Sequence, residues 1–370
     1  MIYHMDEKFY WLGFSNAPGI GPARFSEILE KFGTAKSAWE ADEKELVIVL
    51  KPALTKKFIE FRKEFSIEAY LAKLEKAKVS FVVLEDSGYP QLLKQIKNPP
   101  FVLFYKGNNE ILRRASLAQD DVSIGIVGTR KITDYGRQVT ESITRELVDA
   151  GCVIVSGLAM GVDAVAHGTT IKNSGKTIAV LGCGVDCCYP RENQKIYEEI
   201  LDSGGLIVSE YGIGQQPTIG SFPSRNRIIA GLSNGVLVTE GAIDSGALIT
   251  ANDAFAIGRK VFAVPGPITS SLSQGPYALL KKGAVVVGSG EEILEALQVS
   301  GNKKKKARKI TGDTKEEQQI IELLSEQELH FDELVRKTKI DPSELGTMLS
   351  MMEMKGMIRA LSAGFFGLGT

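Results

Sequence analysis

Small residues and one arginine follow three apolar, Val- and Ile-rich runs of the chain, and this pattern could bind an anion. The residues are Gly128, Thr129 and Arg130 after Ser123–Val127, Ser156 and Gly157 after Cys152–Val155, and Ser245 and Gly246 after Gly235–Thr239. Glycines and small hydroxyl residues at a helix start leave backbone N–H groups free, and the helix dipole favours a negative charge there. Glycine is common in any strand-to-helix turn, so one such turn is weak evidence. Three of them with cations nearby predict a phosphate-binding edge.

The cations and an aromatic residue for this edge come from two further segments. The segment Ser221–Arg227 contains Phe222, Arg225, Asn226 and Arg227, and Lys176 directly precedes the apolar run Thr177–Leu181. Arginine suits two-pronged contacts with phosphate, and a base stacked on an aromatic ring contributes about 1–3 kcal/mol. We therefore expect Arg130, Lys176, Arg225 and Arg227 to gather at one edge beside Phe222. In the alternative interpretation, Phe222 is a core residue and the arginines form surface ion pairs.

Residues for catalysis or metal binding are sparse. His167 lies in a helical pattern next to this edge, where it could face a ligand or fill the core. Asp163, Glu240 and Asp244 could form a carboxylate set, but they fit equally well as acids at helix starts. The segment Thr170–Thr177 ends like a phosphate-binding Walker loop, yet it lacks the first glycine and precedes a strand.

The cysteines also lack a pattern for chemistry. Three of the four lie within Cys183–Cys188, without paired C-x-x-C units and without a nearby histidine. No G-x-S-x-G nucleophile motif occurs in the chain. The sequence therefore predicts no catalytic residue, no metal site and no cofactor.

Seven apolar runs alternate with helical patterns through the middle of the chain, which favours a doubly wound parallel α/β sheet. The expected strands are Ser123–Val127, Cys152–Val155, Thr177–Leu181, Leu206–Ser209, Gly235–Thr239, Lys260–Val264 and Ala284–Val287. The expected helices are Tyr135–Ala150, Asp163–Asn173, Gln194–Asp202, Ser224–Leu232, Ala247–Ala256 and Tyr277–Lys282. Ligands of such sheets bind beyond the carboxyl ends of the strands, which is where the small residues occur.

Four domains or linkers are expected along the chain. Residues 1–75 form a helical domain of the SAM or helix-hairpin-helix kind, and 76–298 the α/β domain. Residues 299–314 form a basic flexible linker, and 315–370 a winged helix with three helices and a terminal hairpin. Expected flanking helices are Lys8–Asn16, Pro22–Phe32, Thr34–Ala41, Leu54–Phe65, Lys315–Glu326, Phe331–Thr338 and Pro342–Lys355. The hairpin Pro18–Pro22 could present N–H groups to a DNA phosphate or be a plain helix connection.

The charge balance is near neutral, with 44 Lys+Arg and 45 Asp+Glu in 370 residues. This excludes only a uniformly basic surface, because a whole-chain sum does not locate charges. Residues 299–314 hold 6 basic and 1 acidic residue, whereas 315–370 hold 6 and 10. An acidic winged helix is poorly suited to reading bases, so we expect it to dock a protein. Neither a signal peptide nor a membrane-spanning run is evident, which predicts a cytoplasmic protein.

At this point the sequence resembles the DNA-processing protein A (Smf/DprA) family. The motifs are Gly128–Arg130, Ser156–Asp163 with Ala166-His167, Gly182–Gly184 with Tyr189-Pro190, Ser221–Arg227 and Ser245–Thr250. Tyr89-Pro90, Pro99-Pro100 and Phe104–Gly107 are similar to the lead-in of its extended Rossmann domain. The resemblance is dense over residues 80–298 and looser in the helical front and the winged-helix back.

This resemblance implies a non-enzymatic protein that binds single-stranded DNA, protects it and loads the RecA recombinase onto it during natural transformation. It implies a homodimer formed through the Rossmann domain, with self-association and RecA contacts near Tyr277–Val287. The DNA pocket carried over from the family comprises Arg130, Ser156, Gly157, Lys176, Phe222, Arg225, Asn226 and Arg227, with Ser245-Gly246 closing its rim.

Two other classes of function stay open. One is an enzyme, a nucleoside monophosphate phosphoribohydrolase with a related core, although Thr239–Ser245 stands where its Pro-Gly-Gly-x-Gly-Thr-x-x-Glu signature would be. The other is a structural scaffold, which predicts no affinity for nucleic acid.

Overall fold

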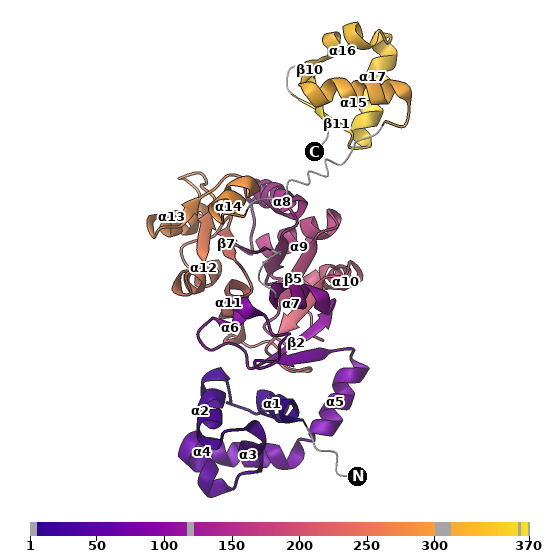
Figure 1. The fold of residues 1–370 in the computed structure, drawn as a ribbon. Helices are drawn as coiled ribbons and strands as arrows, with labels where there is room; N and C mark the ends of the chain where they lie inside the picture. The colour runs from indigo at the N-terminus through magenta and orange to yellow at the C-terminus, as the bar shows by residue number, and fades with distance from the viewer. Residues whose placement is uncertain (1–5, 117–121, 300–311, 362–363, 369–370) are drawn as a thin grey trace. The chain divides into compact units, whose positions relative to one another are not determined.

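The computed structural model describes residues 6–116, 122–299, 312–361 and 364–368 (Figure 1). The chain forms two units, Met1–Lys303 and Lys304–Thr370, and each is described by itself. The expected basic linker falls mostly on residues 300–311, outside the described ranges. None of the helices in these ranges is long and apolar enough to cross a lipid bilayer.

The first unit begins with helices whose core is rich in aromatic side chains. They are α1 (Glu7–Asn16), α2 (Pro22–Phe32), α3 (Ala35–Glu40), α4 (Glu43–Glu64) and α5 (Ile67–Lys76). The ring of Phe25 packs on Trp11, with centroids 4.8 Å apart, and stacks on Phe101 of the next domain at 4.1 Å. The helical bundle therefore shares its core with one end of the sheet.

The bundle differs from the sequence prediction at two places. Helix α4 starts at Glu43, well before the expected Leu54, because Asp42 and Glu45 form a capping box there. The chain kinks at Lys51, which has φ 62°, since the following Pro52 disfavours a helical conformation in the residue before it. The additional helix α5 completes the bundle.

The sheet has nine strands, and their order confirms the α/β fold class. The strands are β1 (Ser80–Val83), β2 (Val102–Gly107), β3 (Ser123–Val127), β4 (Val153–Ser156), β5 (Lys176–Val180), β6 (Leu206–Ser209), β7 (Gly235–Val238), β8 (Lys260–Ala263) and β9 (Val285–Val286). Their order is β1-β2-β6-β5-β4-β3-β7-β8-β9. Strands β3 to β9 are parallel, whereas β1 and β2 add an antiparallel edge beside β6. The order reverses between β3 and β7, where ligands of doubly wound folds bind.

Helices cover both faces of this sheet. The remaining elements of the unit are α6 (Gln91–Lys94), α7 (Asn109–Ser116), α8 (Asp134–Asp149), α9 (Val162–Lys172), α10 (Gln194–Asp202), α11 (Ser221–Gly231), α12 (Ala247–Ala256), α13 (Gln274–Lys281), α14 (Gly290–Ala296) and the short turns η1 (Arg191–Asn193) and η2 (Ser271–Ser273). Ile126 of β3 belongs to the core with α8, and its neighbour Val127 belongs to the core with α11 and α12. Both faces are thus apolar, as the continuous Val- and Ile-rich runs predict.

The second unit has the predicted three helices and terminal hairpin. Its elements are α15 (Lys315–Glu326), β10 (Leu329–His330), α16 (Phe331–Thr338), α17 (Pro342–Met354), β11 (Ile358–Ala360) and β12 (Phe365–Leu368). The strand order is β10-β12-β11, all antiparallel. Lys355, directly after α17, pairs with Asp313 at 2.8 Å and Glu317 at 2.9 Å. Helix α17 exposes Met351 and Met354, and docking of a protein partner there stays a prediction.

Candidate nucleic-acid interface

A cavity of about 440 Å³ lies beyond the carboxyl ends of β3, β4 and β5. Its lining includes Arg130, Gly157, Gly182, Tyr189, Phe222 and Arg225. Helix α11 starts at Ser221, three residues earlier than predicted, so Phe222 lies in its first turn rather than in a loop. The predicted strand-end edge therefore exists, and one aromatic residue from α11 lies beside it.

The open side of this cavity combines aromatic rings with cations. The Cζ atom of Arg130 lies 5.7 Å from the ring centroid of Phe222, within cation–π range. The ring centroids of Tyr189 and Phe222 lie 5.4 Å apart, and the two ring planes are tilted by 35°. Tyr189 is 46% exposed. Exposed Arg191 also lines the cavity. Such a surface suits a ligand that combines a flat ring with a negatively charged group.

Tyr189 and Arg191 are functional candidates that the sequence reasoning missed. Both lie in the Cys183–Asn193 region, whose turns bring them next to Phe222. The Tyr189-Pro190 pair belonged to the family motif, and this signal could have placed Tyr189 in the pocket.

Arg225 lines the floor of the cavity and is bound mostly to groups of the protein itself. It is only 5% exposed, and its Nη1 donates to Gly157 O at 2.5 Å and to Val180 O. Its Nε donates to Asn226 Oδ1 at 3.2 Å. Burial lowers the pKa of Arg225, and the nearby Asp163 opposes this shift. Oxygen atoms of the protein thus occupy Nη1 and Nε of Arg225, and a phosphate contact by this residue stays a prediction.

Asp163 completes this support from the start of α9. Its Oδ2 accepts hydrogen bonds from Gly157 N at 3.0 Å and Ala159 N at 3.3 Å. These bonds hold a turn in which buried Leu158 has φ 56°. Burial raises the pKa of the Asp163 carboxyl, and Arg225 and the two N–H groups act against that rise. Asp163 is thus a structural acid at a helix start.

The other predicted small residues join neighbouring strands. Ser156 is fully buried and donates from Oγ to Ile126 O at 2.6 Å. The Thr129 N–H donates to Glu240 O at 2.7 Å, and Thr129 O accepts from Val162 N at 3.1 Å. A Cβ on Gly128 would lie 2.5 Å from Val162 Cγ2. These contacts build the edge, and Ser156, fully buried and outside the cavity lining, is not accessible to a ligand, so its predicted place in the DNA pocket is wrong.

Two other predicted residues connect helices. Asn226 Nδ2 donates to Gly246 O at 3.2 Å, which joins α11 to the turn before α12. Ser245 Oγ accepts from Ala247 N at 3.3 Å. Neither Ser245 nor Gly246 lines the strand-end cavity, so this turn lies at the same sheet edge without closing the cavity.

Arg227 and Lys176 do not join Arg130 at the cavity. Arg227 pairs with Glu210 at 2.5 Å and lines a different cavity. Lys176 is the first residue of β5 and pairs across with Val153, the first residue of β4. The first residue of a parallel strand lies at the amino edge of the sheet, opposite the carboxyl edge. The prediction that all four cations share one rim is therefore wrong.

His167 and the cysteines belong to the interior. His167 is fully buried, and its Nδ1 lies 2.7 Å from Thr177 Oγ1, whose hydroxyl donates to Ile154 O at 2.8 Å. Burial lowers the pKa of His167 to about 3, so the ring is neutral. Cys183 Sγ donates to Cys187 O at 3.2 Å. Within the described ranges, no three His, Cys, Asp or Glu side chains are grouped so that they could hold a metal ion.

Comparison with known proteins adds independent evidence. Residues 80–298 match the model of the family described as DNA recombination-mediator protein A, and residues 304–364 match the DprA winged helix domain. Protein Smf of Synechocystis sp. is 40% identical over 294 residues, covering 79% of this chain and 73% of that protein. The DNA processing protein DprA of Streptococcus pneumoniae is 42% identical over 227 residues, covering 61% and 77%.

Two solved structures share the fold. The X-ray structure of DprA from Streptococcus pneumoniae has a TM-score of 0.67 and 35% identity, covering 78% of this chain and 97% of that one. A structure of Helicobacter pylori DNA processing protein A, described for its single-stranded DNA binding mode, has a TM-score of 0.52 and 31% identity, covering 60% and 97%. Since the family model spans more than half of the sequence and Protein Smf of Synechocystis sp. is 40% identical over 79% of it, this chain belongs to the DprA/Smf family of DNA-processing proteins.

Proposed function

We propose that this protein binds single-stranded DNA at the strand-end cavity and hands the strand to the RecA recombinase without catalysing a reaction. The observation that carries this proposal is that half-buried Phe222 lies beside exposed Tyr189 and Arg130 beyond the strand ends. Aromatic faces accept any base, and a nearby cation attracts the backbone, which is how single strands are bound without reading sequence. The Helicobacter pylori relative, described for its single-stranded DNA binding mode, supports this assignment.

A non-enzymatic role fits the state of the polar residues around the cavity. Asp163 and Ser156 are occupied by hydrogen bonds inside the protein, and His167 is buried away from solvent. Glu240 accepts hydrogen bonds from Thr133, 2.6 Å from its hydroxyl. These residues lack the freedom that a general base or nucleophile needs. Incubation with nucleoside monophosphates should therefore release no free base.

The exposed end of the sheet supports a homodimer formed through this domain. Strand β9 pairs with β8 and ends the sheet. Val285 is 38% exposed and Val286 is 59% exposed. An open strand edge with apolar side chains invites pairing with another chain. We place self-association and RecA contact at Tyr277–Val287, as the family resemblance implies. Sedimentation of a Val286→Lys variant tests the self-association.

Fluorescence anisotropy with a labelled oligothymidine over a series of salt concentrations tests the DNA site. Phe222→Ala should weaken binding about 5- to 150-fold, the equivalent of one stacked base. Arg130→Ala should reduce the slope of log K against log salt by about 0.7, because one phosphate contact disappears.

The neighbouring Lys131→Ala is the matched control for Arg130→Ala. Lys131 is exposed like Arg130 but does not line the cavity. Equal effects of the two substitutions would reject a specific role of Arg130. Unchanged affinity of Phe222→Ala would reject the strand-end cavity as the DNA site.

A further inference from the structure

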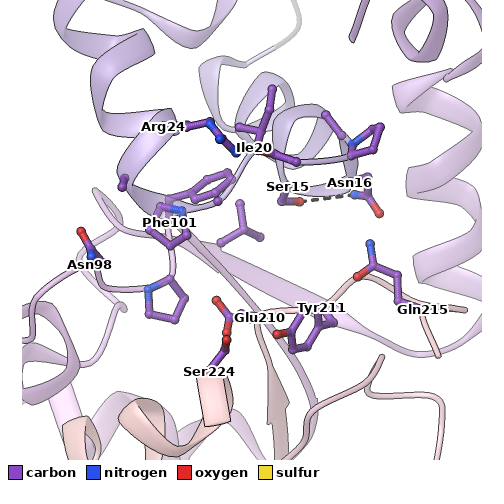
Figure 2. A pocket seen from close by; sticks show the side chains of 18 of the residues that line it. Ser15, Asn16, Ile20, Arg24, Asn98, Phe101, Glu210, Tyr211, Gln215 and Ser224 are labelled. Carbon is purple, nitrogen blue, oxygen red and sulfur yellow. Dashed lines mark hydrogen bonds between the residues drawn. The ribbon is translucent and has the colours of Figure 1, made fainter. Parts of the chain in front are cut away.

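A second and larger cavity, of about 750 Å³, lies between the N-terminal helices and the sheet. Figure 2 shows Ser15, Asn16 and Arg24 on the helical side, and Glu210, Tyr211 and Ser224 on the sheet side. All of these residues belong to the first unit of the chain. A volume of this size is in the range of small-molecule and cofactor sites, about 300–1,000 Å³.

The floor of this cavity contains an ion pair in which each side chain has one atom without a hydrogen bond. Glu210 pairs with Arg227, yet Glu210 Oε1 and Arg227 Nη1 have no hydrogen-bond partner among the described residues. Burial raises the pKa of Glu210, and Arg227 opposes the rise. Buried polar atoms without a partner are rare in native proteins and call for water or a ligand. An adjacent acceptor and donor match the edge of a nucleobase, which presents donors and acceptors side by side.

Further hydrogen-bonding groups surround the pair. The side-chain amides of Asn98 and Gln215 line the cavity and have no hydrogen bond to any described residue. Tyr211, hydrogen bonded to Ser224, provides an aromatic ring at the wall. These uncharged groups suit a base rather than a fatty or strongly charged ligand.

The mouth of the cavity suits the phosphate that follows a base. Helix α2 starts there with Pro22, which has no N–H, and its N-cap Gly21 gives no side-chain cap, so the open N–H groups are those of Ala23 and Arg24. Exposed Arg24 lies in the same turn, where its Nη1 donates to Gly19 O at 2.5 Å. The end of the hairpin Pro18–Pro22 can thus bind a phosphate, and it lines the same cavity as Glu210 and Arg227.

The first turn of α11 connects the two cavities. Phe222 lines the strand-end cavity, whereas Ser224, two residues later, lines the second one. A single strand crossing the start of α11 reaches both. Building on the proposed function, we propose that the second cavity is a nucleotide subsite for the same DNA strand, holding a base above Glu210–Arg227 and its phosphate at the start of α2.

Binding measured as a function of oligonucleotide length tests this subsite. The probes are labelled oligothymidines of about 4 and about 16 nucleotides, the limits of common single-strand site sizes. The test variant is Arg24→Ala combined with Gln215→Ala. It should bind the long probe about tenfold more weakly, a loss of about 1.4 kcal/mol, and the short probe as the wild type does. Lys31→Ala, an exposed cation further along α2, is the matched control and should change neither affinity.

The two proposals fail in different ways. Unchanged affinity of the double variant for the long probe, or an equal loss for both probes, overturns the second subsite. Unchanged affinity of Phe222→Ala for both probes overturns the strand-end site instead. Photocrosslinking gives a second readout that does not depend on the variants' stability: a long strand with a photoreactive base should crosslink to Tyr211, and crosslinks at Tyr189 without Tyr211 contradict the subsite.

Discussion

Replacement of Arg225 by methionine should destabilise the fold rather than remove a DNA contact. The guanidinium is 5% exposed, donates to Gly157 O and Val180 O, and faces Asp163. Methionine keeps much of the volume but leaves the two carbonyls without their donor and the buried Asp163 carboxylate without its compensating charge. Removing one of two buried charges that compensate each other costs about 3–5 kcal/mol. At about 2–4 °C per kcal/mol for a large domain, the Tm should fall by roughly 6–20 °C.

Differential scanning calorimetry measures this effect, with Arg130→Met as the matched control. Arg130 is exposed, so its replacement should change stability by about 0.5 kcal/mol at most. The double variant Arg225→Met with Asp163→Asn should regain part of the loss, because no buried charge is then left unpaired. A Tm of Arg225→Met close to the wild type, together with DNA binding as weak as that of Arg130→Met, would refute the structural role of Arg225.

Three further outcomes are expected. Lys176→Ala should bind oligothymidine as the wild type does, since Lys176 lies at the amino edge of the sheet; weaker binding in anisotropy would contradict this. Gly157→Ala should lower both Tm and DNA affinity, because a Cβ there would lie 2.5 Å from Arg225 Nη1; a wild-type melting curve would argue against it. Burial lowers the pKa of His167 to about 3, whereas the unfolded chain binds that proton near its ordinary value of 6.5. The contribution of neutral His167 to the free energy of unfolding is therefore fully present above about pH 6.5 and is lost as the pH falls toward 3. The loss should be about 3 kcal/mol at about pH 4.5. A His167→Gln variant should lose this slope in urea titrations at several pH values, and an unchanged slope would show that other groups cause it.

Much of the fold follows from local patterns that the sequence shows directly. Strands β3 and β6 and helices α2, α10, α12, α15 and α16 have the predicted bounds, because their apolar residues recur with the period of one element. The antiparallel direction of β1 and β2 could not be predicted from these patterns, since strand direction depends on the path of the chain between strands. Helix α4 was placed too late, because its first half is ended by a kink before Pro52.

Only part of the candidate site could be predicted from the sequence. Residue types and turns located the strand-end edge and selected Arg130 and Phe222, which do lie together there. Tyr189 comes from a separate loop that packing brings next to Phe222, and its only signal in the sequence was the Tyr189-Pro190 motif of the family.

What the sequence determined by itself was the order of elements, the apolar faces and the edge where small residues collect, because these depend on neighbours along the chain. The tertiary structure decided which cations are available. Arg225 and Arg130 are the same residue type beside similar turns, yet one is buried against carbonyls of β5 and the β4–α9 turn and the other lies over an aromatic ring. Arg227 is held by Glu210, a residue 17 positions away. Burial and partners from distant segments set the free energy of each charge, and a linear pattern does not contain them.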